Sequence, residues 1–357
     1  APLVGPGDMN LELAMTTPSI DHTILWELRL PRVLLALAGG AILAMSGAAF
    51  QTLFRNPLAE PYTLGVAGGA ALGAVLALQI GDWSTVGGFS MVALASFIGA
   101  ATVGVILVGL ARTRRGAETG TLLLAGIAIS LSCSALILFI QYLADFTRSF
   151  RMVRWMMGGL AVVGYREVLW VVPFALLGGA VLFGKRWSLD LLLAGEEVAA
   201  SRGLDLDRTR WIVLAVVSLM VGSLVAVTGP IGFVGLIVPH ILRRFVGSTH
   251  ALLLPAAFLG GGAFLALCDL AARTLMPPTE LPVGVLTALL VLLLAPRGRA
   301  DITRTVKPAP APVWTCPVRD GAPISQGNGG EISHTSKGSF YAFDYNVAEG
   351  TPIVAAR

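Results

Sequence analysis

Residues 229–240 read Gly-Pro-Ile-Gly-Phe-Val-Gly-Leu-Ile-Val-Pro-His, and Arg243-Arg244 follow shortly after. The segment is apolar, yet glycine and proline recur through it. An interior glycine costs a soluble helix about 1 kcal/mol and an interior proline about 3 kcal/mol. In a membrane bundle, small residues let backbones approach closely, and neighbouring helices satisfy the polar groups that proline frees. The segment therefore predicts a tightly packed, irregular element of a polytopic membrane protein.

The composition supports this interpretation. The 357 residues are 55% hydrophobic and only 13% charged, with a mean hydropathy of +0.78, whereas soluble domains are about 25% charged. The net charge of +4 comes from basic residues scattered between apolar runs, which argues against a nucleic-acid surface. The three cysteines are widely spaced, so neither a disulfide framework nor a paired-cysteine metal site is expected.

The apolar runs predict an all-α membrane helix bundle. A helix needs about 20 apolar residues to cross a bilayer, and nine runs are candidates, the shorter ones tilted or half-buried. They are residues 30–54, 64–80, 88–110, 121–143, 168–183, 211–227, 231–245, 252–275 and 281–295. If the first run crosses from outside to inside, the inner loops carry roughly twice as many arginines and lysines as the outer loops, as the positive-inside rule requires.

The chain divides into four predicted segments. Residues 1–28 are polar enough for an outer loop, and residues 29–296 form the transmembrane domain. Residues 297–312 contain alternating Pro and Ala, which is typical of an extended linker. Residues 313–357 are polar and predict a short, incomplete β-type tail, because so few residues cannot build a dependable core.

Several motifs occur in the order found in one family of transporters. They are Arg29-Leu30-Pro31-Arg32, Arg55-Asn56-Pro57-Leu58-Ala59-Glu60-Pro61, the 229–244 segment, and Glu280-Leu281-Pro282-Val283-Gly284-Val285. Residues from about 25 to 290 thereby resemble the FecCD-type permeases, the membrane subunits of ABC importers for iron-siderophores, haem and cobalamin. The resemblance implies a ten-helix subunit of the inner (cytoplasmic) membrane, of which nine spans are visible here.

The resemblance also implies partners. A second permease copy forms a homodimer or pseudo-dimer, two ATPase subunits bind inside, and a periplasmic substrate-binding protein delivers the substrate. The transport path is expected along the axis of the two copies, lined by residues 121–143 and the last span. The chain has no phosphate-binding Gly-rich loop with Lys, so ATP hydrolysis belongs to a partner. We expect no cofactor and no enzymatic activity of the chain itself.

One loop is the candidate contact with the ATPase. Residues 189–206 predict two short helices joined at Gly195, too polar at one end to span the membrane. In the family, this loop forms the coupling helices that sit in a groove of the ATPase. The candidate coupling residues are Leu193, Gly195, Glu196, Glu197, Ala200, Arg202 and Gly203. The alternative is a solvated amphipathic loop without a partner.

Two arginines are candidates for docking the binding protein. The resemblance implies that Arg29 and Arg273 receive glutamates from that protein, and we expect both as exposed cations on separate loops, where charges set association rate and register. Two alternatives stay open. Arg29 could instead extend to the membrane interface, and Arg273 could pair with Asp269 one helical turn earlier.

The tail has a resemblance of its own. His334 and Asp344 match the first two zinc ligands of lysostaphin-like endopeptidases, but no His-x-His follows. Catalytic zinc needs three protein ligands and an open position, so the two residues are interpreted as a degenerate, incomplete pair, and no metal site is expected. Two rival functions remain: a membrane-anchored zinc murein endopeptidase, and a membrane sensor bundle that does not transport.

Overall fold

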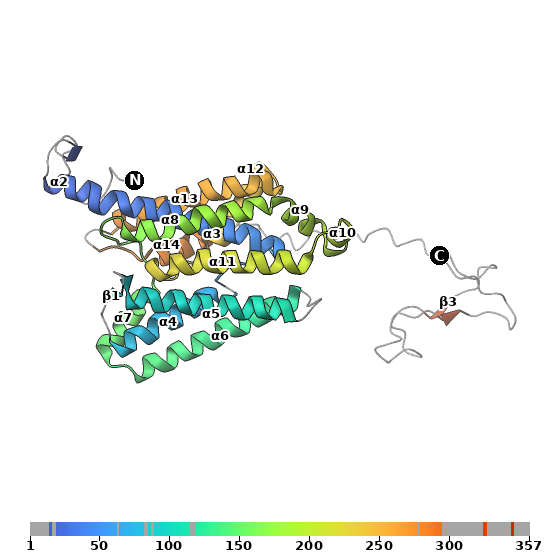
Figure 1. Cartoon of the computed structure of the whole chain (residues 1–357), viewed down its shortest axis with the longest axis horizontal. Coiled ribbons are helices and arrows are strands. Elements are labelled where there is room, and N and C mark those ends of the chain that lie inside the picture. Colours follow the sequence, from blue (N-terminus) through green and yellow to red (C-terminus); the bar gives the residue numbers. More distant parts are fainter. Residues whose placement is uncertain are drawn as a thin grey trace. The chain divides into compact units, whose positions relative to one another are not determined.

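The computed structural model forms two compact units, residues 1–295 and 296–357 (Figure 1). It describes residues 14–15, 19–62, 64–81, 85–86, 89–113, 119–276, 279–294, 324–326 and 344–345. The boundary at 295/296 lies beside the predicted end of the transmembrane domain. The predicted linker, residues 297–312, lies outside the described residues.

The first unit is a helix bundle with one small hairpin. Its helices are α2 (Ile20–Thr23), the π-helix η1 (Ile24–Arg29), α3 (Leu30–Leu53), α4 (Val66–Ile80), α5 (Met91–Thr113), α6 (Thr119–Leu143), α7 (Phe146–Met156), α8 (Arg166–Gly184), α9 (Arg186–Ala194), α10 (Glu196–Ser201), α11 (Leu206–Thr228), α12 (Val234–Val246), α13 (His250–Thr274) and α14 (Val283–Leu294). Strands β1 (Thr85–Val86) and β2 (Phe89–Ser90) pair antiparallel before α5.

The all-α membrane bundle is confirmed. Each of the nine predicted runs contains a helix. Within the described residues, six helices are long and apolar enough to cross a membrane: α3 with its N-terminal extension, α5, α6, α8, α11 and α13. Helices α4, α12 and α14 are shorter, so the count of nine spans stays a prediction. Helix α7 was not predicted from the sequence, because its arginines break the apolar run that marks a span.

The predicted outer loop over residues 1–28 is wrong for residues 20–28. These residues are helical and lead without a break into α3. Ser19 caps the helix by accepting a hydrogen bond from the backbone N–H of His22, and Leu25 is buried against the bundle. Asp21 and Glu27 made the segment too polar to be recognised as part of a span, although one buried face is enough to hold it.

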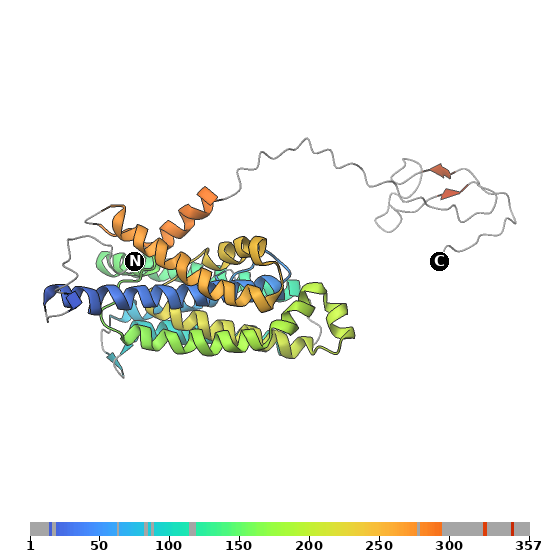
Figure 2. The ribbon, with the colours of Figure 1, turned by 90° about the horizontal axis from the view of Figure 1, so that it is seen from above.

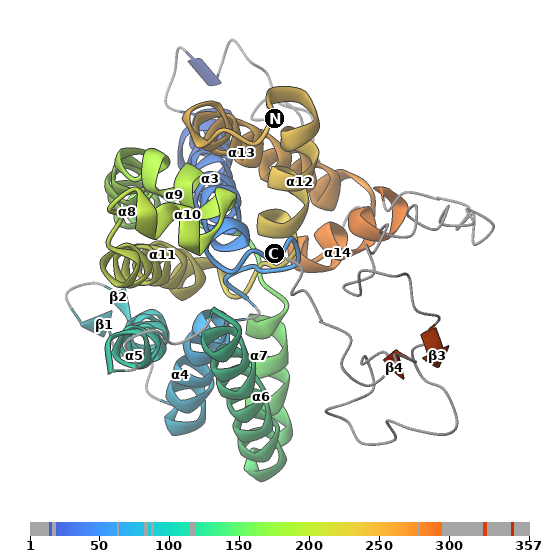
Figure 3. The same ribbon diagram turned by 90° about the vertical axis from the view of Figure 1, so that its right-hand side faces the viewer.

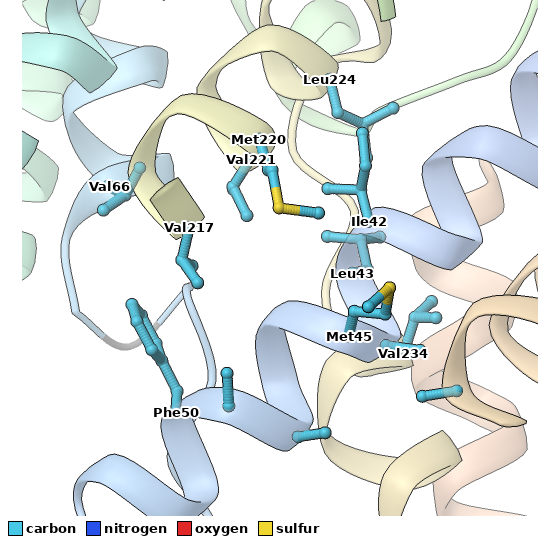
Figure 4. Close-up of a cluster of buried hydrophobic side chains, with 14 of the residues drawn as sticks. Ile42, Leu43, Met45, Phe50, Val66, Val217, Met220, Val221, Leu224 and Val234 are labelled. Carbon is cyan, nitrogen blue, oxygen red and sulfur yellow. The ribbon is translucent and has the colours of Figure 1, made fainter. Parts of the chain in front are cut away.

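Helix α3 is the centre of the bundle. Viewed along the helices, it lies among α8, α11, α12 and α13, while α4, α5, α6 and α7 form a second group beside it (Figure 3). In the most apolar part of the helix over residues 20–53, 89% of residues are buried, against 17% in α6. Figure 4 shows side chains of α3, including Ile42 and Phe50, meeting Val217 and Met220 of α11. This apolar contact holds α11 against α3, and α11 in turn packs against α4 and α5 of the second group.

Glycines set the distance between α3 and its neighbours. A methyl group added to Gly40 would overlap the backbone of Gly261 in α13, and one added to Gly47 would overlap the backbone of Gly235 in α12. The backbones therefore touch at both crossings, as small residues permit in membrane bundles. Since the obstacle is backbone in each case, no side-chain rotation can relieve it.

The second unit is described only at a pair of strands. Strand β3 (Ile324–Gln326) pairs antiparallel with β4 (Asp344–Tyr345), with an irregularity in register. The β-type character predicted for the tail stays a prediction.

Replacing Gly47 by Ala should destabilise the bundle, because overpacking a tight contact costs about 1–3 kcal/mol. Thermal unfolding in detergent would show a lower midpoint for G47A than for the wild type. Gly184→Ala is the matched control, since nothing lies within 4 Å of a methyl at that exposed position. Equal midpoints for G47A and G184A would contradict the packing described here.

Candidate functional site

The bundle has two distinct ends, which we call the α2 end and the α9 end after the helices found there (Figure 1). Helices α3 and α13 are antiparallel neighbours, so the start of α3 and the end of α13 meet at the α2 end. The end of α3 and the start of α13 meet at the α9 end, beside the α9–α10 hairpin. Each predicted group of site residues belongs to one of these ends.

Charged side chains connect three segments at the α2 end, and all of them but Glu280 are buried. The Arg32 guanidinium in α3 lies 2.9 Å from an Asp269 carboxylate oxygen in α13, and 3.0 Å from Glu280, which precedes α14. The other oxygen of Asp269 lies 3.1 Å from Nε of Arg273. Asp269 therefore sits between two guanidinium groups, and the opposite charges offset the cost of burying them.

The expectation that Arg29 and Arg273 are exposed cations is wrong for the single chain. Arg29 is only 7% exposed and Arg273 only 5%. The alternative pairing of Arg273 with Asp269 is confirmed. The physical reason is that Arg29 lies in the π-helix that packs on the bundle, and Asp269 draws Arg273 inward. The docking role of the two arginines stays a prediction.

A cavity of about 610 Å³ also lies at the α2 end. It is bounded by the start of α5, by α7, by the loop and first turn leading into α8, and by residues 280–283, which lead into α14. Its charged lining residues are Arg32, Arg151, Arg154, Arg166, Glu167 and Glu280. Apolar side chains such as Trp155 and Leu160 complete the wall. The volume falls within the range of about 300–1,000 Å³ that is usual for small-molecule sites.

The α9–α10 hairpin has the predicted form. Helices α9 and α10 meet at Gly195, whose φ of 127° breaks the helix between them. The hairpin projects from the end of the bundle (Figure 2). Of the candidate coupling residues, Glu196, Ala200 and Gly203 line a groove of about 480 Å³.

The remaining candidates lie on the outside of the same hairpin. Leu193, Glu197 and Arg202 are exposed. The structure thus brings the seven candidates together on one projecting element.

The residue that holds α10 in place was not predicted from the sequence. Arg210 of α11 lies 2.7 Å from Glu196 and 3.5 Å from Asp207.

A second contact that sequence analysis missed holds α9. The Asp190 carboxylate accepts a hydrogen bond from the backbone N–H of His250 at 2.8 Å and lies 2.6 Å from Nδ1 of its ring. The other ring nitrogen lies 2.8 Å from the Thr52 hydroxyl. The three residues are far apart in the chain, and each is an ordinary residue type for its position, so no spacing signals the contact.

No group of three or more possible metal ligands occurs among the residues that the structure describes. His334 lies outside those residues, and Asp344 begins β4. The incomplete zinc pair therefore stays a prediction.

Replacing Asp269 by Asn should destabilise the fold strongly, because breaking a buried ion pair costs about 3–5 kcal/mol. The matched control is Asp145→Asn. Asp145 pairs with Arg148, but its side chain is 57% exposed, against 1% for Asp269, so D145N should cost less than about 1 kcal/mol. Thermal unfolding of both variants in detergent measures the difference, and similar midpoints would refute the buried network.

Comparisons with known proteins bear on the whole helical unit. The model of the FecCD transport family matches residues 3–294. The chain is 39% identical to the uncharacterized ABC transporter permease protein YvrB of Bacillus subtilis, over 74% of this chain and 75% of the relative. It is 40% identical to the cobalamin import system permease protein BtuC of Halobacterium salinarum, over 78% and 73%.

A solved structure agrees with these relatives. An inward-facing conformation of a putative metal-chelate type ABC transporter superposes with a TM-score of 0.73 at 33% identity, covering 82% of this chain and 91% of that chain. The match includes the apolar helices from which membrane crossing was inferred. The chain belongs to the FecCD transport family: it is a multi-pass permease subunit of an ABC importer in the inner (cytoplasmic) membrane, not itself an enzyme, and it works with separate ATPase subunits and a substrate-binding protein.

Proposed function

We propose that this permease carries an iron chelate, haem or cobalamin inward, and that the cavity at the α2 end is the entrance of the path. The cavity carries the proposal, because it lies at the end of the bundle opposite the α9–α10 hairpin. The names of the relatives support this substrate class: cobalamin and vitamin B12 import, and metal-chelate transport.

The charge of the cavity favours a negatively charged chelate. Four arginines and two glutamates line it, so its formal charge is positive when all six are ionised. A cavity with a low-dielectric wall and lining charges mostly of one sign raises the local concentration of ligands of the opposite charge. The apolar part of the wall suits the large organic surface of a chelate.

In this proposal the α2 end faces outward and the α9 end faces the cytoplasm. The binding protein docks over the α2 end, where Arg29 and Arg273 lie. Because both side chains are covered, their proposed part is to shape the docking surface and give it positive charge. The α9–α10 hairpin contacts the ATPase through the candidate coupling residues.

A second permease copy completes the path. Helix α6 is the candidate span with the smallest buried share in the single chain, and Leu124, Leu131 and Leu138 are exposed along it. We place this surface and α14 beside the axis shared by the two copies. Packing of α6 against a second copy would cover part of the apolar area that one chain leaves open.

Reconstitution in proteoliposomes tests the function. With its ATPase and binding protein, the chain should take up at least one of a ferric siderophore, haem or cobalamin in an ATP-dependent manner, and the most negatively charged chelate should be favoured. A complex with an inactive ATPase is the control for passive leakage. Zinc-dependent cleavage of peptidoglycan without uptake would favour the endopeptidase, and ATPase association without flux would favour the sensor; either result would refute the proposal.

Cross-linking from single cysteines tests the two docking surfaces. In a background without Cys133, Cys268 and Cys316, cysteines at Glu197 and Ser201 should cross-link the ATPase, because both residues are exposed on α10. A cysteine at Thr279, exposed near the α2 end, should cross-link the binding protein and not the ATPase. The reverse pattern would show that the orientation proposed here is wrong.

A further inference from the structure

We propose that Asp190, His250 and Thr52 form a clamp that transmits movement of α9 to the membrane helices, and that these are positioning residues for coupling ATP hydrolysis to transport. The inference rests on the proposed function in one respect, namely that the α9–α10 hairpin faces the ATPase. The clamp itself is inferred from contacts between three helices.

The contacts join one residue from each helix. Asp190 belongs to α9, His250 is the first residue of α13, and Thr52 lies in the last turn of α3. Asp190 holds His250 twice, through the backbone N–H at 2.8 Å and the ring at 2.6 Å. The ring is fully buried and reaches Thr52 at 2.8 Å. A displacement of α9 therefore pulls on both α13 and α3.

The donors and acceptors fit in either protonation state of the ring. With one proton, Nδ1–H donates to Asp190 and Nε2 accepts from the Thr52 hydroxyl; the carboxylate fixes this tautomer. With two protons, Nε2–H donates to Thr52, whose hydroxyl can then donate to the carbonyl of Ala48 at 3.1 Å. The link between the three helices survives in both cases.

The movement has a defined route beyond Thr52. The neighbouring side chain, Gln51, donates to the carbonyls of Gly235 and Leu236 in α12 at 3.2 and 3.3 Å, and it accepts a hydrogen bond from Arg243. The end of α3 is thus bonded to α12 through Gln51 and to α13 through Thr52 and His250, and Asp190 joins α9 to the same His250. The backbone contacts at the glycines make α3, α12 and α13 move together, because close-packed interiors transmit strain.

A purely structural role would not require this chemistry. Apolar residues of similar volume often stabilise a buried site as well as a charged pair does. A hydrogen-bonded chain instead fixes direction and distance, since hydrogen bonds weaken steeply when they are bent or stretched. The glutamate that anchors α10, Glu196, makes a comparable contact with Arg210, so both halves of the hairpin are attached to the bundle by polar contacts.

Thr52→Val tests the clamp, because valine keeps the shape and removes the hydroxyl. In the reconstituted complex, uptake per ATP hydrolysed should fall at least about five-fold, while ATPase assembly and basal ATP hydrolysis stay at the wild-type level. Thr52→Ser should restore coupling. The matched control is Ser223→Ala, which removes a buried hydroxyl bonded only to Met220 within its own helix at 2.7 Å.

Hydrogen exchange on the full-length chain gives a second measurement that does not depend on transport. The amides of residues 186–194 should exchange faster in T52V than in the wild type or S223A, although Thr52 is on another helix. Unchanged exchange in α9 would overturn the clamp. So would an equal loss of uptake and ATP hydrolysis in T52V, or uncoupling of the same size in S223A. If the wild type transports nothing, the proposed function fails, and the exchange measurement alone decides the clamp.

Discussion

Backbone contact between α3 and its two neighbours is the constraint on which the other interactions depend. Gly40 and Gly261 let α3 touch α13, and Gly47 and Gly235 let it touch α12. With the helices this close, even side chains of moderate length can bridge them: Arg32 reaches Asp269 at one end, and Thr52 reaches His250 at the other. A single methyl group at the Gly40–Gly261 crossing would move α3 away from α13 and lengthen both bridges.

The two ends of this helix pair use different polar chemistry. At the α2 end, Arg32 and Arg273 share Asp269, so opposite charges offset the cost of removing one another from water. At the α9 end, a carboxylate, an imidazole and a hydroxyl form a hydrogen-bonded chain. The first arrangement holds the surface proposed for the binding protein, and the second connects the surface proposed for the ATPase. The α3–α13 pair is thus a stiff connection between the surface proposed for the binding protein and the surface proposed for the ATPase.

The cavity relates this connection to transport. Arg32 belongs both to the buried network and to the cavity wall, and Glu280 joins the wall to the segment before α14. A movement of α3 relative to α14 would therefore change the charged lining through contacts that already exist. Helix α7 supplies two further arginines to the same wall. The arrangement places the entrance of the proposed path beside the helices that the clamp would move.

Much of the architecture could be predicted from the sequence, because a membrane demands long apolar runs and internally satisfied backbones. The nine helical runs, the hairpin joined at Gly195 and the family follow from such local patterns. Local patterns failed where polarity hid a helix, as at Asp21 and Glu27. The burial of Arg29 and Arg273, the cavity and the Asp190–His250–Thr52 contact were decided only by the tertiary structure. Each depends on side chains that packing brings together from distant parts of the chain, and no local periodicity records such a distance.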